Sequence, residues 1–323
     1  MSGGVTKRKR TLFALIGTGI LVGVGVLTTL VTLSTETDTM KGKAAIAQFL
    51  DTPQYLDRPA GQIAYDDQGN GPLVVMVPGL GDIRAEYRKL TPKLLDAGYR
   101  VVTMDLRGHG QSSTGWPDYS ASALGSDVEA LVEKLDAGPA ILVGDSMGAA
   151  AVSWAAADAP GLVSRLVLIG PFVRAETQTT WWQNLVQQVM IKVGLNGPWA
   201  PGMWANYYGS IYGQKPDDFE TYQVALKASF SEPGRMDALR GMMDVSKADV
   251  AARLHEITAP TLIFMGSADP DFPDPKLEAD TVAGLINGKV IMVEGAGHYP
   301  QVEDPDLVAR HLVAFAEGKG AAS

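Results

Sequence analysis

One sharp turn constrains this chain more than any other segment. Residues Gly144 to Gly148 read G-D-S-M-G, between an apolar run at 139–143 and an alanine-rich run at 149–157. The apolar run predicts a strand and the alanine-rich run predicts a helix, so the chain must turn tightly at Ser146. The central residue of such a turn is strained, and side chains two positions before and after it would collide, which explains the two glycines. The turn presents the Ser146 hydroxyl outside the sheet, where the positive end of the helix dipole also points.

The rest of the chain predicts a layered α/β fold, because runs typical of strands alternate with helical patterns. The last five strand-like runs are almost continuous in Val, Ile, Leu and Met, which is typical of strands covered by helices on both faces. The alternation predicts a doubly wound, mostly parallel sheet. The strand-like runs are 62–66, 73–77, 100–105, 140–143, 165–169, 261–265 and 289–293, and the helical patterns lie near 85–97, 120–135, 147–157, 276–286 and 305–316.

The alternation is interrupted at residues 171–259, a stretch that reads as helical and holds four of the six tryptophans. We interpret this stretch as a helical cap over the carboxyl edge of the sheet, where open α/β sheets bind ligands. A cap rich in Trp, Tyr and Met favours an apolar acyl or aromatic ligand. The candidates for lining its pocket are Trp199, Met203, Trp204 and Tyr207.

Two loops supply the partners that a reactive serine requires. A serine hydroxyl needs a base to remove its proton and a third group to orient that base. Asp269 and His298 each lie in the loop after a late strand-like run, and the order Ser, Asp, His is the one that this architecture uses. Asp271 and Asp274 lie in the same loop and are rivals for the acid, although Pro270 and the G-x-x-D spacing favour Asp269.

Four motifs make the chain resemble the α/β-hydrolase superfamily over about residues 62–315. They are V-P-G-L-G at 77–81, D-L-R-G-H-G-Q-S at 105–112, G-D-S-M-G at 144–148 and G-A-G-H-Y-P-Q-V-E-D-P at 295–305. The resemblance implies that Ser146 is the nucleophile, His298 the base and Asp269 the acid that orients the base. It also implies an oxyanion hole made by the backbone N–H groups of Leu80 and Met147.

Other polar residues near these motifs are assigned to the fold. In similar proteins the R-G-H-G segment around His109 builds a turn. Asp145, beside the nucleophile, is expected to be a solvated carboxylate, and Glu303 is expected to begin a helix near the histidine loop. Many relatives have His-Gly where this chain has Pro78-Gly79, a departure that a backbone donor further along the loop tolerates.

The resemblance implies a serine hydrolase that cleaves carboxylic esters through an acyl-enzyme. Relatives that act on carbon–halogen bonds or epoxides have an aspartate at the position of Ser146, which argues against both reactions. Two alternatives stay open. One is a slow or non-catalytic relative that senses a ligand, and the other is a carbon–carbon bond hydrolase or cofactor-free perhydrolase with the same triad. A lipid-like ester is a further hypothesis for the substrate.

Composition argues against several kinds of partner. No cysteine is present, which excludes thiolate metal sites, and with four histidines we expect no multi-histidine metal site. The motifs imply no metal or organic cofactor. The formal net charge is −9, and because the first 34 residues contribute +4, the remaining residues carry −13. A body this acidic repels phosphate backbones, so we expect no nucleic-acid partner.

The amino-terminal segment predicts a membrane anchor. Lys7 to Arg10 form a basic cluster, and residues 11–34 carry no charge. As a helix these residues would be about 36 Å long, enough to cross a hydrocarbon core of about 30 Å. An uncleaved signal anchor would keep the basic cluster in the cytoplasm and place the catalytic domain on the non-cytoplasmic side of the membrane. A cleaved signal peptide, which would give a secreted protein, and a buried core helix are the alternatives.

These predictions divide the chain into four parts. Residues 1–34 are the basic terminus with a transmembrane helix, and residues 35–60 are a tether. Residues 61–170 and 260–318 are the α/β core, and residues 171–259 are the cap.

Overall fold

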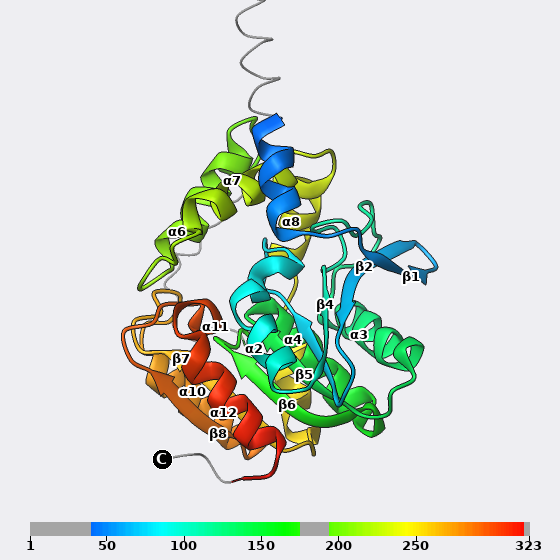
Figure 1. The fold of residues 1–323 in the computed structure, drawn as a ribbon, viewed down its shortest axis with the longest axis vertical. Helices are drawn as coiled ribbons and strands as arrows, with labels where there is room; N and C mark the ends of the chain where they lie inside the picture. Colours follow the sequence, from blue (N-terminus) through cyan, green and yellow to red (C-terminus); the bar gives the residue numbers. More distant parts are fainter. Residues whose placement is uncertain (1–39, 175–193, 320–323) are drawn as a thin grey trace, which may run out of the picture.

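One mixed sheet forms the centre of the molecule in the computed structural model, which describes residues 40–174 and 194–319 (Figure 1). It consists of β1 Gln54–Arg58, β2 Gly61–Gln68, β3 Leu73–Val77, β4 Arg100–Met104, β5 Ala140–Asp145, β6 Val163–Ile169, β7 Thr261–Gly266 and β8 Lys289–Val293. Their order is β1-β2-β4-β3-β5-β6-β7-β8. The pairings of β1 with β2 and of β2 with β4 are antiparallel, and the later pairings are parallel. The mostly parallel α/β sheet predicted from the sequence is therefore confirmed.

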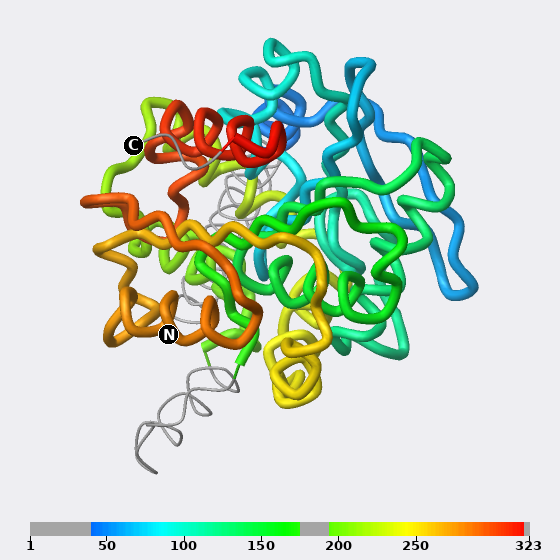
Figure 2. Tube along the Cα trace, turned by 90° about the horizontal axis from the view of Figure 1, so that it is seen from below, coloured from blue at the N-terminus to red at the C-terminus, as the bar shows by residue number. Residues whose placement is uncertain are grey.

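Helices cover both faces of this sheet. They are η1 Arg84–Lys89, α2 Thr91–Asp96, α3 Ala121–Leu135, α4 Met147–Asp158, η2 Pro160–Leu162, α10 Pro275–Ile286, α11 Pro300–Glu303 and α12 Pro305–Ala316. Successive residues of a strand point to opposite faces. In β3, Val75 belongs to a core shared with α3, α4 and α10, whereas Val74 and Met76 belong to a core shared with α2 and α12. Figure 2 shows α10 (orange) and α12 (red) on opposite sides of the late strands.

The residues between β6 and β7 include the cap helices. These are α6 Ala200–Ser210, α7 Phe219–Phe230, α8 Arg235–Met243 and α9 Ala248–Arg253, followed by η4 Leu254–Glu256. Residues 40–49 form a further helix, which Figure 1 shows in blue beside α7. Phe49 of this helix meets Tyr222 of α7 edge-to-face, with 5.2 Å between the ring centroids. Residues 175–193 of the predicted cap lie outside the described residues.

Part of the segment predicted as a tether, residues 35–60, is folded. Besides the helix at 40–49, β1 adds an edge strand to the sheet. Only Leu56 of β1 is buried, so this strand lacks the apolar run by which strands are found in a sequence. Arg58 at its end pairs with the buried Asp127, with 3.0 Å between Nε and Oδ1.

The predicted transmembrane helix, residues 11–34, lies outside the described residues. Within residues 40–174 and 194–319, no helix is both long enough and apolar enough to cross a membrane.

Candidate active site

Ser146 occupies a strained turn between β5 and α4. Its φ is 50° and its ψ is −111°, a conformation that side chains rarely adopt. A Cβ atom on Gly144 would lie 2.4 Å from the carbonyl oxygen of Gly148, and one on Gly148 would lie 2.2 Å from the carbonyl oxygen of Val77. Both glycines are therefore required by sterics, as the sequence predicts. The Ser146 hydroxyl makes no capping hydrogen bond to the backbone of α4.

His298 and Asp269 lie side by side in the interior. The Nδ1 atom of His298 is 2.7 Å from Oδ2 of Asp269, and both side chains are buried. The two rival acids have other partners: Asp271 accepts a hydrogen bond from the Tyr207 hydroxyl at 2.7 Å, and Asp274 caps α10. The structure thus brings Asp269, rather than its neighbours, into hydrogen-bonding contact with the histidine.

The electrostatic environment favours a proton on His298. Burial works to lower the pKa of this imidazole, but the Asp269 carboxylate outweighs burial, with further contributions from Asp145 and Asp271. Together these groups raise the pKa of His298 to about 10. A histidine in this setting is a strong proton acceptor once it is neutral.

Ser146 and His298 open into one cavity of about 530 Å³. Leu80 and Met147, the predicted oxyanion residues, line the same cavity. Three of the four predicted substrate-binding residues also line it, and these are Met203, Trp204 and Tyr207. The fourth, Trp199, is not among the lining residues: it is 55% exposed, and its indole N–H donates to the Gly194 carbonyl at 3.0 Å.

Several lining residues escaped the sequence analysis. They are Phe172, Leu195, Tyr208, Ile211, Met243, Lys247, Pro270 and Tyr299. The sequence pointed to two of them, because Phe172 follows β6 at the carboxyl edge of the sheet and Tyr299 follows His298 within its motif. Lys247 places its ammonium 2.9 Å from the centre of the Phe172 ring, which adds one positive charge to a largely apolar wall.

The two predicted oxyanion donors are backbone N–H groups that the described part of the fold does not use. In the part of the chain that the structure describes, neither the Leu80 N–H nor the Met147 N–H donates a hydrogen bond to another protein group. The preceding N–H, that of Gly79, is already used, because it donates to the Glu86 carboxyl at 2.8 Å. Leu80 and Met147 both line the cavity, and an N–H group without a protein acceptor is the kind of donor that an oxyanion hole requires.

Three acidic side chains are buried beside this loop. Asp82, Glu86 and Asp145 each have no exposed surface, so Asp145 is not the solvated carboxylate that we expected. Burial raises the pKa of Glu86 and Asp145 well above the usual range, and it raises the pKa of Asp82 to about 6. Desolvation disfavours the charged form of a carboxyl group, so burial favours proton uptake by all three acids.

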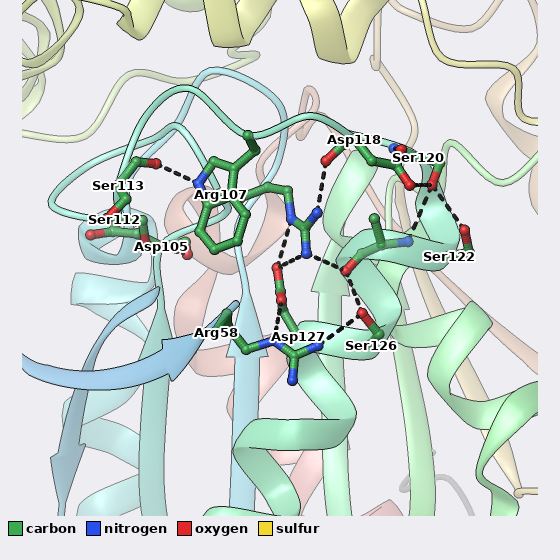
Figure 3. Close-up of polar contacts among 12 residues, drawn as sticks. Arg58, Asp105, Arg107, Ser112, Ser113, Asp118, Ser120, Ser122, Ser126 and Asp127 are labelled. Atoms are coloured by element: carbon green, nitrogen blue, oxygen red, sulfur yellow. Dashed lines mark hydrogen bonds and ion pairs between the residues drawn. The ribbon is translucent and has the colours of Figure 1, made fainter. Parts of the chain in front are cut away.

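The D-L-R-G-H-G-Q-S motif builds a turn, as predicted for similar proteins. Figure 3 shows Arg107 pointing at Asp127, and the guanidinium donates to this carboxylate at 2.8 Å. Arg107 also donates to the Asp118 carbonyl at 2.7 Å. His109 is fully buried, and burial lowers its pKa to about 4. His109 therefore stays neutral inside the turn.

Glu303 also has a structural role, but its position in the helix differs from the predicted one. It ends α11 instead of beginning a helix. Its carboxylate accepts hydrogen bonds from the N–H groups of Gly297 at 3.0 Å and Gln214 at 2.6 Å. Glu303 thus ties the histidine loop to the segment between α6 and α7.

This fold and site define a class: a parallel α/β sheet that carries a strained serine at its carboxyl edge, beside a buried His–Asp pair and under a helical cap. Residues 72–305 match the sequence model of the alpha/beta hydrolase fold. The chain belongs to the α/β-hydrolase family, and the resemblance drawn from its motifs is confirmed.

Individual relatives differ in what they are named for. The chain is 31% identical over 280 residues to 2-hydroxy-6-oxononadienedioate/2-hydroxy-6-oxononatrienedioate hydrolase 2 from Pseudomonas putida, covering 79% of this chain and 91% of the relative. It shares its fold with a thermophilic esterase from Thermogutta terrifontis, with a TM-score of 0.70, 22% identity and coverage of 83% of this chain and 99% of the esterase. A bromoperoxidase from Bacillus anthracis gives a TM-score of 0.70 at 22% identity, with coverage of 82% and 100%.

Proposed function

We propose that the protein is a serine hydrolase that cleaves carboxylic esters with apolar acyl or aromatic groups. The observation that carries this proposal is the placement of Ser146 and His298 on one cavity, with Asp269 hydrogen-bonded to the far side of the imidazole. Nucleophile, base and orienting acid are the three parts that acyl transfer by a serine needs.

The reaction follows from these positions. Ser146 Oγ attacks the ester carbonyl while His298 Nε2 takes the hydroxyl proton, and Asp269 stabilises the imidazolium. The Leu80 and Met147 N–H groups bind the negative oxygen of the tetrahedral intermediate. His298 returns the proton to the leaving alcohol, which leaves an acyl group on Ser146. A water molecule then gives a proton to His298 and attacks the acyl carbonyl. His298 passes this proton to Ser146 Oγ as the bond to the acyl group breaks, which releases the acid and regenerates the serine.

The cavity supports the choice of substrate class. Its volume of about 530 Å³ lies in the range of sites for small organic molecules. Most of its lining is apolar or aromatic, including Phe172, Leu195, Met203, Trp204 and Met243. An acyl chain or aromatic ring would bury its surface there, so a lipid-like ester is part of the proposal.

Hydrolysis of a p-nitrophenyl ester series from short to long acyl chains tests the proposal. Turnover by the full-length chain should disappear in Ser146→Ala, and the preferred acyl length should exceed that of the shortest soluble esters. A folded protein without Ser146-dependent turnover on any member would favour a ligand sensor, and turnover confined to the shortest esters would contradict the apolar pocket.

A second candidate is hydrolysis of a bond other than an ester. The Pseudomonas putida relative is named for an unsaturated hydroxy-oxo dicarboxylate, a compound whose name contains no ester group. A carbon–carbon bond hydrolase can use the same serine, and so can a cofactor-free perhydrolase. Assays with a vinylogous diketo acid, and with acetate plus peroxide, separate these activities from esterase turnover.

We also propose that residues 11–34 anchor the protein in a membrane, with the catalytic domain on the non-cytoplasmic side. The support is the charge-free run behind the basic cluster Lys7 to Arg10. Membrane fractionation with alkaline carbonate washing tests the anchor. Release of the whole chain by the wash, or recovery of a shortened chain outside the cell, would instead support a secreted protein.

A further inference from the structure

The loop between β3 and η1 carries Leu80, one of the two proposed oxyanion donors, and core residues hold the start of this loop. The hydroxyl of Tyr87 donates to the Val77 carbonyl at 2.8 Å. The Glu86 carboxyl accepts from the Gly79 N–H at 2.8 Å. Both Tyr87 and Glu86 are fully buried, so side chains of the core fix the backbone from Val77 to Gly79.

Cap residues hold the end of the same loop. The indole N–H of Trp204, on α6, donates to the Gly81 carbonyl at 2.9 Å. The hydroxyl of Tyr222, on α7, donates to Oδ1 of Asp82 at 2.5 Å. A Cβ atom on Gly81 would lie 2.2 Å from the Trp204 ring, so the indole packs directly on the loop backbone. The two residues that follow Leu80 are therefore both held by the cap.

We propose that Tyr222 and Trp204 are positioning residues for the hydrolytic reaction: they hold Asp82 and Gly81 so that the Leu80 N–H faces the developing oxyanion. The inference rests on the proposed function, because it requires an oxyanion to be bound. A donor acts only when it lies about 2.7–3.1 Å from the oxygen of the transition state, and a displacement of about 1 Å can cost roughly 100-fold in rate.

The buried acids explain why the end of the loop needs hydrogen bonds from the cap. A Cβ atom on Gly79 would lie 2.8 Å from Oδ2 of Asp145, so the loop rests almost directly on this carboxyl group. Asp82 and Glu86 are fully buried in the same region, so their carboxyl groups depend on hydrogen bonds from the protein. The Tyr222 hydroxyl gives Asp82 a donor inside the protein. Without it, Asp82 keeps the Ile83 N–H and the interaction with the Tyr208 hydroxyl, a residue of the cap.

Tyr222→Phe tests the proposal, because it removes one oxygen and leaves a ring that does not line the cavity. Tyr212→Phe is the matched control, since the Tyr212 hydroxyl pairs with that of Tyr208 at 2.7 Å in the same aromatic cluster and does not contact the loop. We would measure kcat and KM of the full-length chain on its best p-nitrophenyl ester, and the Kd of phenylboronic acid, which forms a tetrahedral adduct with an active-site serine.

For Tyr222→Phe we expect kcat to fall roughly 10- to 100-fold, with KM changed by less than about twofold. Phenylboronic acid should bind more weakly by a similar factor, because it depends on the same oxyanion donors. Tyr212→Phe should keep wild-type values. Asp82→Ala should lower kcat as Tyr222→Phe does, and the double variant should be no worse than the single ones, because the two residues act through one hydrogen bond.

Two results would overturn the inference alone: a folded Tyr222→Phe protein with wild-type kcat, or a loss confined to KM. If Tyr222→Phe does not fold, Trp204→Phe decides, since it removes the N–H to Gly81 and keeps an aromatic ring; unchanged kcat and unchanged boronic-acid binding would count against the proposal. A wild-type protein without Ser146-dependent turnover would overturn the proposed function, and the inference with it.

Discussion

The Nδ1 atom of His298 lies 2.7 Å from Oδ2 of Asp269, and both side chains are buried at the carboxyl edge of the sheet. This contact fixes which ring nitrogen carries the proton, and so leaves Nε2 as the acceptor for the Ser146 hydroxyl. The backbone N–H of His298 donates to the carbonyl of Ile211, the residue after α6, at 2.8 Å, which ties the histidine loop to the cap.

Replacing Asp269 by Asn should lower kcat by about 10⁴-fold, because an amide can stabilise the wrong tautomer of His298 and cannot stabilise the imidazolium. Folding should be preserved, since the amide has nearly the same shape. Ester hydrolysis by the purified variant measures the loss. Asp271→Asn is the matched control: Asp271 accepts a hydrogen bond from Tyr207, and its Oδ2 lies 3.8 Å from His298 Nδ1, beyond hydrogen-bonding distance, so its substitution should cost far less. Equal losses in the two variants would contradict the assignment of the acid.

The pH dependence of kcat/KM should show a rising limb above the ordinary histidine pKa of 6.5. His298 accepts the serine proton only when it is neutral, and the carboxylates of Asp269, Asp145 and Asp271 outweigh burial to raise its pKa. Activity should therefore grow with pH through the neutral range and level off on the alkaline side. Ser146→Ala corrects for spontaneous hydrolysis. A limb centred below about pH 6 would show that the histidine is not held protonated.

Gly148→Ala should destabilise the protein by more than about 3 kcal/mol, because the new methyl group would meet backbone and not a side chain that can move. Its Cβ would lie 2.2 Å from the Val77 carbonyl oxygen and 2.6 Å from that of Pro78. Urea denaturation measures the change in unfolding free energy.

Gly284→Ala is the control for this substitution. Gly284 lies within α10, and a Cβ atom there would meet nothing within 4 Å. We expect this variant to be neutral or more stable by up to about 1 kcal/mol, since Ala favours helices. Similar stability changes at both positions would argue against steric demand at the turn.

The sequence predicts those features of the molecule that depend on nearby residues. The turn at Ser146 is one of them, because Gly144 is required by contacts with α4 and Gly148 by contacts with the end of β3. The loops of Asp269 and His298 follow directly from the strands before them. These parts could be read without a structure.

Features that depend on distant segments could not be read in this way. Asp145 looks like a solvated carboxylate in the sequence, but the loop at Gly79 packs on it and buries it completely. Trp199 and Trp204 look equivalent in the sequence. The structure places Trp204 on the cavity and against Gly81, whereas Trp199 precedes α6 and is largely exposed. Only tertiary packing distinguishes them.

Arg107→Ala should destabilise the fold by about 3–5 kcal/mol, the usual cost of removing one partner from a buried ion pair. The Arg107 guanidinium donates to Asp127 and to the Asp118 carbonyl (Figure 3). It also donates to the Ala123 carbonyl and stacks on Trp116, with 4.6 Å to the ring centre. Without it, the buried Asp127 keeps the partly exposed Arg58 as its one ionic partner among residues 40–174 and 194–319.

Thermal and urea denaturation of this variant should be compared with Lys276→Ala, which removes a surface pair. Lys276 and Asp280 are 68% and 52% exposed and lie four positions apart on α10, so their contact contributes at most about 0.5 kcal/mol. Since Arg107 lies in the motif that also holds His109, its loss should unfold the turn while leaving Ser146, His298 and Asp269 chemically intact. The expected result is a protein of lowered stability whose remaining folded fraction keeps wild-type kcat. A variant that is stable but inactive would instead place Arg107 in the reaction itself.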